Sequence, residues 1–313
     1  MNGTERRIEI FKPFGEAFDL MQTILFRPFD FKKWLVIGFA AFLSGHFGGG
    51  GFNFPSQWGR HPARTQTFNP PNFEEWKPWL LILIVTAVVV VIALVVVLAW
   101  LKARGNFIFT DCIVHNRGAI AAPWREYRKE GNSYFLFTLA VMFGAIIVFG
   151  LFFAVIAGFG FLTRGHQTMS VTAMALLALV FLCWIAFCII FNVVMYFTPF
   201  VMYRERSLAM AAFREVLNLI ASNPGPFILF CLFGFVLLLA TIVIGIMATC
   251  VTCCLAALPY VGSVIVLPVS VCLRAFGLCF LRQFGPDYDV WRPMPRPEPP
   301  PITSPPPLPP AQP

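Results

Sequence analysis

One arginine, Arg274, lies inside the last long apolar segment of the chain, about two helical turns before Arg282. A charge at the centre of a membrane helix costs about 2.5–3.5 kcal/mol on insertion scales, so such a residue usually has a partner or a task. Arg274 could bind an anion or a lipid headgroup. It could also reach the interface with its long side chain, or pair with Asp111 or with a helix C-terminus. We take it as a candidate anion- or headgroup-binding residue.

An amide in a second apolar segment, Asn192, is the other candidate for this site. An amide in hydrocarbon needs a hydrogen-bond partner, and Pro199 leaves a backbone carbonyl free one turn upstream. These polar groups could line a cavity together with Arg274, or they could join neighbouring helices.

Two groups of residues resemble metal ligands in type but not in number. Three thiols share one helix face, because they follow at i, i+3 and i+4: Cys250, Cys253 and Cys254. A soft metal such as Cu(I) would need further ligands, and neither a second cysteine cluster nor a His-rich loop supplies them. Asp111, Cys112 and His115 also share a face, for which we expect a polar anchoring role. We therefore predict no metal site and no cofactor.

Enzymatic groups are missing from the apolar segments. All fifteen acidic residues fall outside them, whereas an intramembrane aspartyl protease or a carboxylate relay needs an acid within the bilayer. The four long uncharged runs contain no histidine for haem ligation, and no nucleophile can be paired with a base. We expect no catalytic residue and a non-enzymatic protein.

The elements that carry these residues are long uncharged runs. The runs at 79–101, 134–162, 173–201 and 226–258 contain no charged residue or histidine, and each exceeds the roughly 20 residues needed to cross a bilayer as a helix. Their continuous apolarity excludes an alternating β-barrel. We predict an all-α polytopic membrane protein with six transmembrane helices arranged as three hairpins. The spans are expected at 31–50, 79–101, 134–162, 173–201, 226–257 and 262–283.

Basic residues give this chain its predicted orientation. The N-terminal arm and segment 102–133 hold six Lys and Arg each, and segment 202–225 and the C-terminal tail hold three each. The opposite side holds four. Lys and Arg are retained on the cytoplasmic side, so both termini are expected in the cytoplasm at an inner membrane. The net charge of +8 then indicates anionic membrane lipids as partners, with no nucleic acid. The first span is short and could be re-entrant.

Amphipathic segments precede the outward spans. Apolar residues recur at helical spacing in 14–25 and again in 209–220. This order suggests three repeats, at 1–101, 102–201 and 202–290, within one transmembrane domain 1–290. The alternative is that any hairpin protein carries amphipathic linkers on its charged side. From residue 291 to 313 proline dominates, which predicts a disordered cytoplasmic tail that could bind a partner protein.

The chain resembles a group of uncharacterised bacterial six-span membrane proteins. Three segments carry the resemblance: Ala122-Pro123-Trp124-Arg125-Glu126-Tyr127, Leu258-Pro259-Tyr260-Val261-Gly262, and Leu273 through Asp289. This group is similar to the membrane domain sometimes fused to glycerophosphodiester phosphodiesterases. The resemblance implies membrane hairpins with cytoplasmic connectors and no catalytic residues, and the phosphodiesterase domain itself is absent from this chain.

These observations lead to two expectations about function. The first is a non-enzymatic membrane protein that organises lipid or a partner protein. The alternative is a transporter or channel for a small anionic or amphiphilic solute, with Arg274 as its binding charge. In that case Asn192 and the breaks at Pro199 and Pro268 would shape the cavity.

Overall fold

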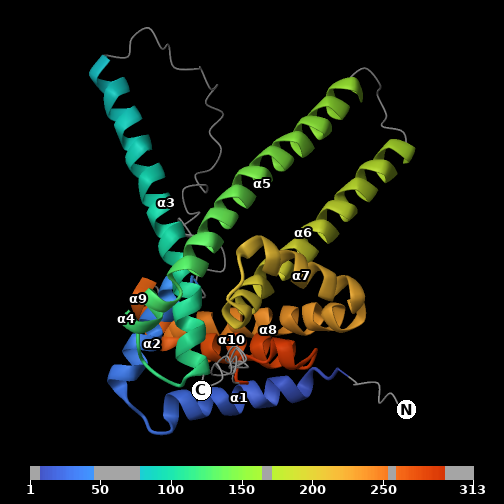
Figure 1. Ribbon diagram of the computed structural model, residues 1–313. Coiled ribbons are helices and arrows are strands. Elements are labelled where there is room, and N and C mark those ends of the chain that lie inside the picture. Colours follow the sequence, from blue (N-terminus) through green and yellow to red (C-terminus); the bar gives the residue numbers. More distant parts are fainter. Residues whose placement is uncertain (1–7, 46–77, 164–170, 253–258, 293–313) are drawn as a thin grey trace, which may run out of the picture.

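The computed structural model describes residues 8–45, 78–163, 171–252 and 259–292, which form helices and connecting turns without a strand (Figure 1). This confirms the all-α class for the described residues. The helices are α1 (Phe11–Phe26), α2 (Phe31–Leu43), α3 (Pro78–Val114), α4 (Ala121–Glu126), α5 (Arg128–Thr163), α6 (Val171–Glu205), α7 (Ala209–Ser222), α8 (Pro224–Val251), α9 (Pro259–Ile265), α10 (Leu267–Arg282) and the 3-10 turn η4 (Pro286–Tyr288).

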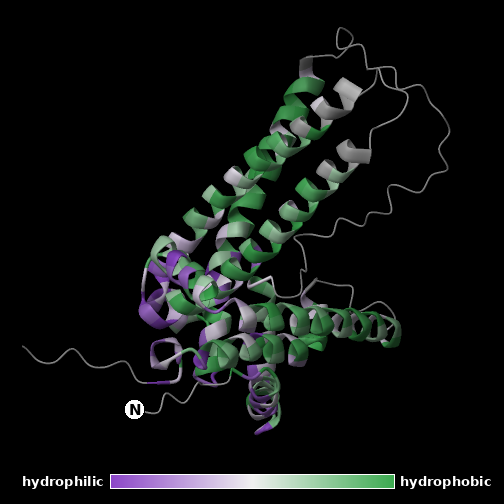
Figure 2. Cartoon of the chain, turned by 90° about the vertical axis from the view of Figure 1, so that its right-hand side faces the viewer, coloured by the Kyte–Doolittle hydropathy of each residue, from purple (hydrophilic) through white to green (hydrophobic). Residues whose placement is uncertain are grey.

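Four of the described helices, α3, α5, α6 and α8, are long and apolar enough to cross a bilayer. In the most apolar stretch of each, no more than 11% of the residues are buried inside the protein. Helices α3, α5 and α6 extend away from a common base, and α8 runs across their direction (Figures 1 and 2). Apolar side chains exposed on this scale are unstable in water and stable in lipid, which identifies a helical membrane protein.

The buried core lies where the charged ends of these helices meet. Helix α3 continues past its apolar run to Val114, and its last turns pack beside α2, α5 and α10. Most of α10 is buried. Aromatic rings from α6, α8 and α10 pack against one another there, among them Phe197, Phe227, Phe230, Phe276 and Phe280. The centroids of Phe230 and Phe280 are 4.6 Å apart, within the range in which aromatic pairs attract.

The two predicted amphipathic segments are helices α1 and α7, and their apolar faces are turned inward. The buried residues of α1 are Pro13, Ala17, Met21, Ile24 and Leu25. Those of α7 are Ala209, Ala212 and Val216. Phe18 and Leu217, on the edges of these faces, are exposed. Helix α1 packs along α10, and α7 packs against α6. Both amphipathic helices therefore cover the core at the charged ends of the long helices.

The predicted first span corresponds to α2, which begins after Asp30. The carboxylate of Asp30 caps this helix by accepting hydrogen bonds from the backbone N–H groups of Lys32 and Lys33. Helix α2 lies beside the charged end of α3, because Lys33 Nζ is 2.6 Å from Asn116 Oδ1. A Cβ on Gly105 would lie 2.6 Å from the carbonyl carbon of Leu43. The two helices therefore approach backbone to backbone at this point.

The predicted sixth span is divided into α9 and α10, which meet at Val266. Helix α2 has 13 residues and α10 has 16. At about 1.5 Å per residue each is shorter than the roughly 30 Å of hydrocarbon. The structure thus supports four spans and does not confirm six. The repeats at 1–101, 102–201 and 202–290 remain a prediction, and the tail from residue 293 onward lies outside the described residues.

Candidate functional site

Arg274 lies near the middle of α10 with 3% of its surface exposed. Its Nε donates to Thr110 Oγ1 at 3.2 Å, and its Nη2 donates to the same oxygen at 3.1 Å. Nη2 also lies 2.9 Å from the carbonyl oxygen of Asn106 and 3.3 Å from Asn106 Oδ1. All three acceptors come from one turn of α3, because Thr110 follows Asn106 by four residues. The guanidinium therefore joins α10 to the charged end of α3.

Aromatic rings enclose the other side of this guanidinium. Its carbon lies 4.6 Å from the ring centroid of Phe200 and 5.9 Å from that of Phe109, so a cation–π attraction adds to the hydrogen bonds. No carboxylate in the described part of the chain forms an ion pair with Arg274. Neutral dipoles and ring faces hold the charge.

Asn192 lies on α6 with an exposed side chain, and no hydrogen bond joins it to Arg274 among the described residues. The two candidate residues are not brought together. The polar group of α6 that does reach α10 is Tyr196, one turn further on, whose hydroxyl donates to the carbonyl of Leu273 at 3.1 Å. Gly277 permits this approach, because a Cβ there would lie 2.6 Å from the Tyr196 hydroxyl oxygen.

The sequence allowed an ion pair between Asp111 and Arg274, and the structure does not form it. Asp111 is fully buried, and its Oδ2 accepts hydrogen bonds from Nε and Nη2 of Arg117 at 3.1 and 2.9 Å. Its Oδ1 accepts from the Tyr203 hydroxyl at 3.2 Å and lies 2.9 Å from Nδ1 of His115. The carboxylate thus ties the end of α3 to the end of α6. This agrees with an anchoring role.

A stack of side chains extends this network towards α4 and α5. The ring of Tyr127 lies 4.7 Å from that of Tyr203, nearly parallel to it, and the guanidinium of Arg206 lies 3.9 Å from the Tyr127 centroid. Burial raises the pKa of the Tyr127 phenol to about 12, so the phenol stays neutral at physiological pH. Arg206 also pairs with Glu126 and Glu130. No periodicity in the sequence indicated these contacts, because they join segments about 80 residues apart.

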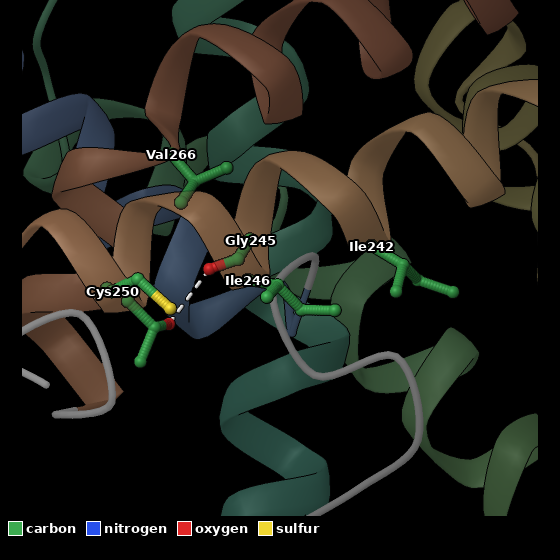
Figure 3. A pocket seen from close by; sticks show the side chains of 7 residues that line it. Ile242, Gly245, Ile246, Cys250 and Val266 are labelled. Atoms are coloured by element: carbon green, nitrogen blue, oxygen red, sulfur yellow. Dashed lines mark hydrogen bonds between the residues drawn. The ribbon is translucent and has the colours of Figure 1, made fainter.

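Cys250 borders an apolar pocket of about 410 Å³ between α8 and α9 (Figure 3). The pocket is lined by Ile242, Gly245, Ile246, Thr249, Cys250, Gly262 and Val266. The Thr249 hydroxyl donates within its own helix to the carbonyl of Gly245 at 2.8 Å, so its proton is not available to a ligand. Cys253 and Cys254 lie outside the described residues. Within the described ranges, no three His, Cys, Asp or Glu side chains are grouped to hold a metal ion.

Comparison with known proteins places the chain in a family. Residues 9–285 match the model of a family of unknown function (DUF7544), and the chain belongs to that family. No curated protein matches the chain. No solved structure matches it either. Membership of an uncharacterised group agrees with the resemblance seen in the sequence, and the comparisons show no link to the domain fused to glycerophosphodiester phosphodiesterases.

Proposed function

We propose that this DUF7544 protein is a non-enzymatic membrane scaffold that organises lipid, or a partner protein, at the cytoplasmic membrane. The observation that carries the proposal is the environment of Arg274. A transporter would keep its binding charge open to solute, whereas here Nε and Nη2 of Arg274 are bound by Thr110 and Asn106. Its plane also faces Phe200. Such a charge supports a structural joint more than a binding site.

The large lipid-facing surface is the second support. Along α3, α5, α6 and α8, apolar side chains are exposed on nearly all sides, and hydrocarbon is the solvent that they require. By contrast, α1, α7 and α10 join the charged helix ends into one compact base. A rigid base with diverging apolar helices presents far more surface to lipid than a closed bundle of the same length.

The proposed topology places both termini and this base in the cytoplasm. The Lys- and Arg-bearing segments between α3 and α5 and after α6 meet at the same base, as the positive-inside rule requires. The contacts of Trp184 on α6 with the rings of Phe149 and Phe152 on α5 support the proposal that these two helices form a hairpin. If the protein has six spans, α2 and the α9–α10 pair are two short spans, and local thinning of the bilayer matches its thickness to their length. The proline-rich tail 291–313 would offer a partner-binding segment.

The alternative is a transporter for a small anionic or amphiphilic solute. The observation in its favour is that Arg274 is a buried cation without a carboxylate partner in the described chain, close to the break between α9 and α10. A solute anion that supplied the missing charge would have to reach a side chain that is 3% exposed and whose Nε and Nη2 are already bound by Thr110 and Asn106.

Anion flux separates the two functions. The full chain is reconstituted into vesicles loaded with chloride, phosphate or a short-chain carboxylate, beside Arg274→Met and the exposed-site control Arg214→Gln. The scaffold predicts flux equal to that of protein-free vesicles for all three proteins. Flux through the native protein that Arg274→Met abolishes and Arg214→Gln preserves would establish the transporter instead.

A further inference from the structure

A second arginine, Arg104 on α3, is held between two indole rings. Its guanidinium carbon lies 4.5 Å from the ring centroid of Trp100 and 4.8 Å from that of Trp124. Nε and Nη2 donate to Oδ1 of Asn132 at 3.3 and 2.9 Å, and the Trp100 indole N–H donates to the same oxygen at 3.2 Å. Only 7% of Arg104 is exposed. The plane of this guanidinium is therefore fixed before any ligand arrives.

One edge of the Arg104 guanidinium has no protein partner. Its Nη1 donates to no atom of the described residues, although Nε and Nη2 are both engaged. Two N–H bonds on a preoriented guanidinium are suited to the oxygens of a phosphate or a carboxylate.

Charges around Arg104 are unbalanced. The nearby acids Glu126 and Glu130 are both directed to Arg206. Across the described residues, no ion pair reaches Arg104 or the exposed cations of the adjoining turn, which are Arg125, Arg128 and Lys129. Arg128 lies one helical turn before Asn132 on α5, and Asn132 accepts from Arg104, so the two positive charges lie on the same side of this contact. Cations to which no carboxylate is paired favour an external anion.

The position of this group along α3 indicates the source of the anion. The uncharged run of α3 ends at Leu101, and Trp100 and Arg104 lie on either side of that boundary. Tryptophan is enriched at the level of lipid headgroups. Arg128 begins α5, whose apolar run starts a few residues later. The free N–H edge is thus at the depth of phosphates, where anionic lipids attract Lys and Arg.

We propose that the Arg104 corner, formed by Trp100, Arg104, Trp124 and Arg128, binds the phosphate of an anionic phospholipid headgroup. Arg104 supplies the buried, oriented donor, and Arg128 supplies an exposed second cation. This inference rests on the proposed lipid-organising function and names the lipid class and the place of contact.

The test is lipid titration of the detergent-purified full chain, followed by native mass spectrometry with phosphatidylglycerol or phosphatidylcholine. The native protein should bind the first phosphatidylglycerol more tightly than phosphatidylcholine. Arg104→Gln and Arg128→Gln should each weaken phosphatidylglycerol binding about tenfold, or about 1.4 kcal/mol. They should weaken phosphatidylcholine binding less, because the choline cation offsets the charge of its phosphate. The matched control Arg214→Gln removes one exposed charge from α7 and should behave as the native protein. Because Arg128 is exposed, its variant remains informative even if Arg104→Gln fails to fold.

Three results would overturn the inference. One is that both corner variants retain phosphatidylglycerol as well as Arg214→Gln does. Another is that they lose phosphatidylcholine to the same extent. The third is that inorganic phosphate displaces the lipid in an Arg104-dependent way at equal concentration, which would make this a site for free phosphate. Anion flux through Arg274 would refute the scaffold and leave this lipid preference intact, so the two proposals fail separately.

Discussion

Two buried charges, Arg274 and Asp111, hold the base of the molecule together by different means. Arg274 is bound by neutral groups of α3 and by the Phe200 ring. Asp111 accepts hydrogen bonds from Arg117 and Tyr203 and lies 2.9 Å from Nδ1 of His115. Buried charges of this kind are stable only when their hydrogen bonds are satisfied. Each therefore makes a specific prediction about substitution.

Arg274→Lys should destabilise the protein by about 1–3 kcal/mol. An ammonium keeps the buried charge, but it cannot reproduce the planar contacts with Thr110, Asn106 and Phe200. Arg274→Met should cost less, because no charge is then left buried. Thermal unfolding in detergent measures both variants, with Arg214→Lys as the surface control. If Arg274→Lys has the same melting temperature as the native protein, Arg274 does not join α10 to α3 in the way proposed.

Asp111→Asn should lower the free energy of unfolding by about 1–3 kcal/mol, a range reduced for the partial exposure of Arg117. Arg117 and Tyr203 donate to different oxygens of Asp111, and an amide keeps only one oxygen to accept both. A double-mutant cycle with Tyr203→Phe, followed by denaturant unfolding, measures how much of the loss passes through Tyr203. Additive losses would show that the Tyr203 contact contributes nothing of its own.

Helix contacts in the base depend on close backbone approach, and most clearly where α2 meets α3. Gly105→Ala should separate these helices and lower the melting temperature, because its Cβ would lie 2.6 Å from the Leu43 carbonyl carbon. Gly144→Ala on α5 is the matched control, since a Cβ there meets nothing within 4 Å. That change should be neutral or stabilising by up to about 1 kcal/mol through helix propensity. Equal melting temperatures for the two variants would argue against the α2–α3 contact.

Local patterns in the sequence predicted the elements better than their contacts. The helical spacing of apolar residues located α1 and α7, because amphipathicity is a short-range signal. Uncharged length located α3, α5, α6 and α8. The packing of α2 beside the end of α3 depends on tertiary contact, which residue spacing along α2 does not encode.

The candidate site shows the same limit. Arg274 stood out as a charge in an apolar segment, whereas its acceptors Asn106 and Thr110 lie more than 160 residues away. Asn192 stood out as a polar amide in an apolar segment, and it proved to be exposed. Arg104 was overlooked because an arginine just past an apolar run looks like an ordinary flanking charge. Its distinction comes from Trp124, which belongs to another helix.

At the scale of the whole molecule, a compact charged base carries long apolar helices that make few contacts with one another. In the proposed topology the base lies at the water–lipid boundary on the cytoplasmic side, and the free helix lengths lie in hydrocarbon. Trp79 begins the apolar stretch of α3, far from the base, and Arg214 is exposed on α7 within the base. The two positions should therefore face opposite sides of the membrane.

The most direct test labels Trp79→Cys and Arg214→Cys, each in a chain whose nine native cysteines are replaced, with a membrane-impermeant thiol reagent on intact cells. We predict that the position of Trp79 is labelled from outside and that the position of Arg214 is labelled only after the cells are permeabilised. Labelling of the Arg214 position in intact cells would place the base outside the cell and contradict the account.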